Sequence, residues 1–64
     1  MTQKELLYVE DAIGHEQSII DICNDALNNL SDENLCSFMK TEIRKHTNTK
    51  EKLISKLEDL CNEW

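Results

Sequence analysis

The sequence contains no proline and only one glycine, Gly14, and aromatic residues make up 5% of it. Proline and glycine mark most turns and chain reversals, so a chain almost without them has few turns. The commonest residue types favour helices, and the alternation of apolar and polar residues that is typical of strands does not occur. The composition therefore predicts an all-α fold built from long helices.

The sequence also lacks a long apolar run and an excess of basic residues. No stretch of 18 apolar residues is present, so we expect no membrane span. Asp and Glu number 13 against 7 Lys and Arg, which gives a net charge of −6. This acidic balance argues against nucleic acids and anionic membrane surfaces as partners. The N-terminus has no basic segment followed by an apolar one, as a signal peptide would, so we expect synthesis in the cytoplasm.

Cysteines are few and odd in number, and they show no C-x-x-C spacing. Cys23, Cys36 and Cys61 therefore do not suggest a zinc site or a closed disulfide framework. All three fall on apolar stripes at helical spacing, so we expect buried thiols that pack as small apolar side chains. A crosslink between chains is the alternative.

A length of 64 residues allows one domain, and such a chain buries only about 60% of its unfolded surface. Scaffolds of this size usually need disulfides, a metal or a partner subunit to be stable.

A capping box formed by Thr2 and Glu5 predicts a first helix over residues 3–29. An apolar seam at spacings of three and four follows, with one polar interruption: Leu6, Val9, Ile13, Glu16, Ile20, Cys23, Leu27 and Leu30. A second stripe lies beside this seam: Tyr8, Ala12, His15, Ile19, Ile22 and Ala26. An apolar face of this width normally contacts two neighbouring helices.

The only turn candidate is residues 28–32, where Asn28 and Asn29 would tolerate a left-handed conformation and Ser31 or Asp32 could cap the next helix. We expect a second helix over 32–62, antiparallel to the first because the loop is short. The seam of this helix also has polar residues in its middle: Cys36, Met39, Ile43, His46, Lys50, Leu53, Leu57, Leu60 and Trp64.

The polar interruptions of the two seams should meet in space. In a hairpin that turns near residue 31, residues whose numbers sum to about 63 lie at the same height. Glu16 then lies beside His46, within a turn of Glu42 and Lys50. Glu42 and His46 are four residues apart, so they share one helix face.

Three interpretations of this constellation remain open. Glu16 could hydrogen-bond to His46 or pair with Lys50 as a buried layer that fixes the helix register. Alternatively, Glu16 and Lys50 could extend to the rim with nothing bound. Finally, Glu16, Glu42 and His46 from two copies could hold iron, manganese or zinc, as carboxylates and histidines do in di-metal four-helix bundles. The spacing Glu-x-x-x-His differs from the Glu-x-x-His of that class.

Two further features are weaker. Asp11 and His15 form another pair four residues apart, but we expect Asp11 on the outer face and His15 partly exposed. No serine has a paired base at recognisable spacing, and no glycine loop could hold a phosphate. We therefore expect no catalytic site and no enzymatic activity.

The stretch from Glu5 to Gln17, ELLYVEDAIGHEQ, resembles the start of the Coat F family of spore coat proteins. Residues 44–46 and 52–57 match the second helix of that family. The family is similar to ferritin-like helical bundles, so the resemblance implies a sporulation-associated structural protein of the spore coat. It also implies coat or sporulation proteins as partners. Relatives often have a second histidine where this chain has Thr49, which weakens the metal hypothesis.

The size and shape are also similar to those of small helical-hairpin phosphatases that act on sporulation phosphorelays. Their signature is Ser-Gln-Glu-Leu-Asp, whereas residues 55–59 of this chain read Ser-Lys-Leu-Glu-Asp. A helical phosphorelay regulator is therefore an alternative.

Together these observations predict an antiparallel helical hairpin that forms a homodimer, completing a ferritin-like four-helix bundle. The expected function is that of a non-catalytic structural or interaction protein. A small metal-binding bundle and a phosphorelay regulator are the alternatives.

Overall fold

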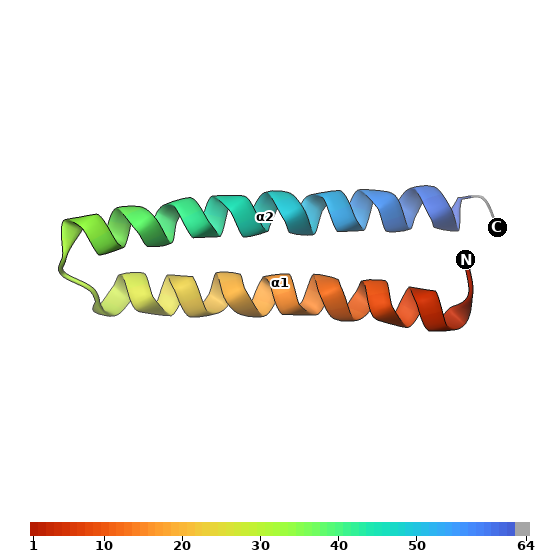
Figure 1. The fold of residues 1–64 in the computed structure, drawn as a ribbon, viewed down its shortest axis with the longest axis horizontal. Coiled ribbons are helices and arrows are strands. Elements are labelled where there is room, and N and C mark those ends of the chain that lie inside the picture. The colour runs from red at the N-terminus through yellow and green to blue at the C-terminus, as the bar shows by residue number, and fades with distance from the viewer. Residues whose placement is uncertain (63–64) are drawn as a thin grey trace.

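The protein is a hairpin of two long antiparallel helices (Figure 1). The computed structural model describes residues 1–62. Helix α1 spans Gln3–Asn29 and helix α2 spans Glu33–Cys61. The hairpin measures 48 × 16 × 11 Å. The predicted all-α hairpin is thus confirmed, and the predicted helix bounds agree to within one residue at each end.

Both helices begin at the caps that the sequence indicates. At α1 the backbone N–H of Thr2 donates to Glu5 Oε1 at 2.9 Å, and the backbone N–H of Glu5 donates to Thr2 Oγ1 at 3.1 Å. At α2 the side chain of Asp32 accepts from the backbone N–H of Leu35 at 2.9 Å. These contacts satisfy backbone donors that have no partner within the helix. Of the two candidate caps for α2, Asp32 is the one used.

The turn does not use the left-handed conformation that asparagine would tolerate. Leu30 is extended, with φ −95° and ψ 138°, and its N–H donates to the carbonyl of Ala26 at 2.9 Å. Among residues 1–62 no backbone φ is positive. The chain therefore reverses through three non-helical residues, 30–32, before α2 begins.

The two seams face each other, but they make a thin core. Ile20 and Cys23 are buried, and the remaining seam residues between 1 and 62 are half-buried or exposed. Two elongated helices can cover only one side of each other, so most apolar side chains keep contact with solvent.

Only one of the three cysteines is a buried thiol. Cys23 is buried, whereas Cys36 is half-buried and its thiol donates to the carbonyl of Leu30 at a Sγ–O distance of 3.6 Å. For Cys61 the prediction was wrong, because this residue is exposed. Cys61 lies at the height of Thr2, where α1 begins, so no helical turn stands opposite it. The seam position assigned to Trp64 lies outside the described residues.

Neither helix contains, within residues 1–62, a segment apolar and long enough to span a membrane.

Candidate functional site

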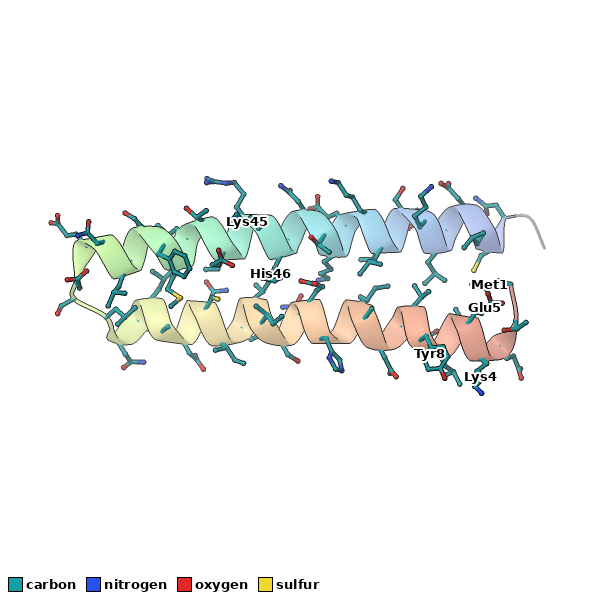
Figure 2. All side chains as sticks on the ribbon, in the orientation of Figure 1. Met1, Lys4, Glu5, Tyr8, Lys45 and His46 are labelled. Atoms are coloured by element: carbon teal, nitrogen blue, oxygen red, sulfur yellow. The ribbon has the colours of Figure 1, made fainter. Side chains whose placement is uncertain are left out.

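The polar interruptions of the two seams do meet at the centre of the hairpin. Glu16 comes from the middle of α1, and His46 comes from the middle of α2. Nδ1 of His46 lies 2.5 Å from Oε2 of Glu16. Figure 2 shows the His46 side chain directed toward α1, whereas Lys45 points away from it. The predicted equal height of Glu16 and His46 is therefore confirmed.

Glu42 brings a second carboxylate to the same imidazole ring. Its Oε2 lies 3.6 Å from Nε2 of His46, within ion-pair distance but too far for a hydrogen bond. The ring of His46 is thus flanked by one carboxylate at each nitrogen, one from each helix.

Water reaches all three side chains of this cluster. The exposed fraction of the side chain is 18% for Glu16, 28% for His46 and 24% for Glu42. No buried side-chain nitrogen or oxygen in residues 1–62 lacks a hydrogen-bond partner. The cluster is therefore a partly hydrated polar layer rather than a sealed cavity, and desolvation of its charges is incomplete.

Lys45 extends the cluster toward solvent. Its Nζ lies 3.5 Å from Oε1 of Glu42, and its side chain is 68% exposed. An ion pair this exposed contributes little to stability, since water screens it and both side chains lose freedom. Lys45 therefore adjusts the local charge without holding the helices together.

Lys50 contacts a residue that the sequence did not indicate. Its Nζ donates to Oε1 of Gln17 at 2.5 Å rather than to Glu16. Gln17 in turn donates from Nε2 to Oδ1 of Asp21 at 2.8 Å, one turn along α1. The only sequence signal is a polar residue that directly follows Glu16, and its half-buried position is seen only in the structure. It was missed because the seam pattern at spacings of three and four passes over it.

Asp11 and His15 are exposed, as expected, and lie on the side of α1 next to the cluster. Together with Ala12 and Glu16 they line a shallow hollow that is open to solvent. The hollow is open to solvent, so it would not enclose a ligand as small-molecule sites do.

One hairpin alone does not provide a metal site. Within the described part of the chain, no group of three or more His, Cys, Asp or Glu residues is arranged to hold a metal ion. In the cluster, Nδ1 of His46 is occupied by its contact with Glu16. The assignment of Glu16, Glu42 and His46 as ligands therefore stays a prediction that requires donors from a second copy.

Comparison with models of protein families, with curated proteins and with solved structures found no match to this chain.

Proposed function

We propose that this protein is a non-catalytic structural protein that works by associating with a second copy of itself. Two hairpins form a four-helix bundle, and the bundle assembles with other sporulation proteins in the spore coat after synthesis in the cytoplasm. The geometry that supports this proposal is that of a subunit: a rigid, capped hairpin with too little core of its own.

The exposed surface carries the argument. The hairpin exposes 4989 Å², whereas a compact monomer of 7.5 kDa exposes about 4,200 Å². The excess is close to the ~800 Å² that each partner buries in an interface of standard size. A second copy could therefore remove from water an area typical of a stable dimer.

The shape supports the same conclusion. The Cα radius of gyration is 14.8 Å, against about 11 Å for a compact domain of this length. Within residues 1–62, six large apolar side chains are exposed, and they are distributed over both helices: Leu7, Tyr8, Ile22, Leu35, Phe38 and Leu60. Helices with apolar faces wider than one neighbour can cover are typical of bundle subunits.

The link to sporulation rests on the resemblance of residues 5–17 to the Coat F family. Those residues include Glu16 and the first half of the apolar stripe beside the seam. In the proposed function this segment builds the assembly rather than a reaction centre.

Analytical ultracentrifugation tests the association directly. We expect a mass of two chains at micromolar concentration. A folded monomer under those conditions would contradict the proposal. Expression of a tagged chain in an endospore-forming host tests the destination, and the tag should appear in the coat fraction of mature spores. Recovery only from vegetative cytoplasm would contradict the coat assignment and leave the dimer in place.

A metal-binding bundle is the second candidate, and the placement of His46 between two carboxylates favours it. Two copies would bring together two sets of Glu16, Glu42 and His46, which are ligand types that suit iron, manganese or zinc. Elemental analysis of the purified dimer tests this candidate. Less than about one-tenth of a metal equivalent per dimer would exclude it, and unchanged thermal unfolding in a chelator would agree with that exclusion.

A further inference from the structure

We infer that the two copies pack face to face with both turns at the same end, so that α1 of each copy lies against α2 of its partner. The inference rests on the proposed homodimer and specifies its contact face and orientation. Three features carry it: the position of the exposed stripes, their apolar content along the hairpin, and the charges of the two helices.

One face of the hairpin is defined by a stripe beside each seam. On α1 the stripe is apolar apart from His15, and its members Tyr8 and Ile22 are 63% and 66% exposed. The seam of α2 repeats that of α1 thirty residues later, as Glu16 and His46 show. The stripe of α2 that corresponds to the α1 stripe is therefore Phe38, Glu42, Lys45, Thr49, Lys52 and Lys56.

Both stripes lie on the same side of the molecule. Two antiparallel helices that face each other are related by an approximate two-fold axis perpendicular to the plane of the hairpin. A rotation about this axis exchanges the two helices, but a residue above the plane of the hairpin stays above it. Corresponding stripes of α1 and α2 therefore lie on the same face of the hairpin. The two stripes, with Leu35 one turn before Phe38 on α2, are called the dimer face below.

The dimer face differs between its two halves. The half near the turn is apolar apart from Glu42, with Phe38 56% exposed, and consists of Ile19, Ile22, Ala26, Leu35, Phe38 and Glu42. The half near the chain ends is largely polar and basic, and only Tyr8 and Ala12 in it are apolar. Its members are Tyr8, Ala12, His15, Lys45, Thr49, Lys52 and Lys56. An orientation that places like halves together packs the apolar half against its own copy rather than against Lys52 and Lys56.

Only two face-to-face arrangements have two-fold symmetry. With the turns at the same end, the apolar half of one copy meets the apolar half of the other, and Ile22 lies near the partner's Phe38. With the turns at opposite ends, Phe38 lies level with the partner's Lys56, whereas Ile22 lies between the heights of the partner's Tyr8 and Ala12. The second arrangement places the charged side chain of Lys56 against Phe38 in the apolar half, which carries a desolvation penalty.

The helix charges favour the same arrangement. Helix α1 carries six acidic residues and one lysine, whereas α2 carries six basic and five acidic residues. With the turns at the same end, α1 lies against α2 of the partner, and Asp11 is level with the partner's Lys52. With the turns at opposite ends, α1 meets α1 and brings acidic residues together. Charge patterns of this kind select one orientation and disfavour the other.

A distance measurement between spin labels at the turn tests the orientation. In a variant with Cys23→Ala, Cys36→Ala and Cys61→Ser, the substitution Ser31→Cys places one label at the turn of each copy. With the turns at the same end, pulsed electron paramagnetic resonance should give a distance of about 20–30 Å, set by adjacent helices and two label arms. A distance near the 48 Å length of the molecule would overturn the orientation.

A label at Asn48→Cys is the matched control. Asn48 is exposed and lies near the middle of α2, so two labels are close in either arrangement. A short distance at Asn48 with a long one at Ser31 would refute the orientation but keep the dimer. The absence of any distance between copies at both positions would mean a monomer and would refute both the dimer and its orientation.

Paired substitutions test the contact face. Phe38→Ser removes an exposed apolar side chain on the dimer face, and Leu7→Ser removes one of similar exposure, 60%, on the opposite side of α1. We expect the dimer dissociation constant to rise at least tenfold for Phe38→Ser and to stay within twofold for Leu7→Ser. Equal effects of the two substitutions, or a larger effect of Leu7→Ser, would refute the assigned face.

Discussion

Glu16 stands where the apolar seam of α1 would otherwise continue, and its partner is His46. The sequence predicted that the two residues lie at the same height, because a short turn fixes how two antiparallel helices align. It left open whether Glu16 would pair with His46 or Lys50, since both positions lie on the α2 seam. The choice depends on side-chain direction, which places Lys50 within reach of Gln17.

We expect Glu16→Leu to leave the free energy of unfolding within about 1 kcal/mol of wild type, or to raise it. A leucine would continue the seam with apolar contacts, and because the cluster is partly hydrated, removal of Glu16 leaves no fully buried charge without a partner. His46 would still be hydrated and close to Glu42, so the free-energy cost of losing Glu16 as its partner is small. Urea unfolding at a fixed protein concentration measures the change.

Glu16→Gln serves as the control for that experiment, because it keeps a hydrogen-bond acceptor for His46 and removes the charge. A loss of more than about 3 kcal/mol in Glu16→Leu alone would mean that the contact with His46 is essential for folding.

Gly14 lies within α1, and a Cβ built on it meets no heavy atom within 4 Å. Glycine inside a helix costs about 1 kcal/mol relative to alanine. We therefore expect Gly14→Ala to raise the free energy of unfolding by roughly that amount, as measured by urea unfolding. Gly14 lies off the dimer face, so the mass in ultracentrifugation should not change. A destabilised variant would instead reveal a neighbour that packs closely against this side of α1.

At the scale of the element, both helices owe their first residues to capping side chains that the sequence displays. The sequence also placed the helix ends within one residue, because caps, seam and a single turn candidate agreed with one another. The exposure of Cys61 was not predicted, because an apolar stripe on one helix is buried only where another helix lies opposite it.

The cap of α2 can be tested with two neighbouring substitutions. Asp32→Ala removes the acceptor for the N–H of Leu35 and should lower the free energy of unfolding by about 1 kcal/mol. Ser31→Ala changes an exposed residue that does not cap the helix, so its effect should be within a few tenths of a kcal/mol. The reverse order in thermal or urea unfolding would mean that Ser31 is the working cap in solution.

The start of α1 should be sensitive to acid. The backbone N–H of Thr2, and secondarily its hydroxyl group, hold the pKa of Glu5 below its ordinary value of 4.5. A carboxyl whose pKa is lower in the folded state stabilises that state fully above its ordinary pKa. The stabilisation is lost as pH falls through the folded pKa.

We therefore expect the amide protons of the first turn of α1 to exchange faster with solvent as the pH falls below 4.5, after correction for intrinsic exchange. Glu5→Gln should remove this additional dependence, since the amide cannot titrate. An identical pH profile in wild type and Glu5→Gln would show that the capping carboxylate does not control fraying.

At the scale of the whole molecule, the notable feature is how little the hairpin buries. Ile20 and Cys23 are its only buried apolar residues within 1–62. In the proposed dimer, association supplies the missing stability, and the stability of an obligate dimer depends on protomer concentration. We expect the thermal midpoint to rise measurably when the concentration increases from 1 μM to 100 μM.

The control for that experiment is Phe38→Ser, which should have a lower midpoint at every concentration. A midpoint of the wild-type protein that does not depend on concentration would mean that the hairpin is stable alone. It would then contradict the dimer on thermodynamic grounds, independently of a mass measurement.

The sequence alone determined the two helices, the cap of α1, the antiparallel hairpin and the height at which Glu16 meets His46. These features follow from local propensity and from seams with a fixed rise per residue, both of which can be read along one chain. Only the tertiary structure decided that Lys50 contacts Gln17, that Cys61 is exposed, and that the core consists of two buried residues. Burial and side-chain pairing depend on what stands opposite each residue in space, and periodicity along a single helix does not contain that information.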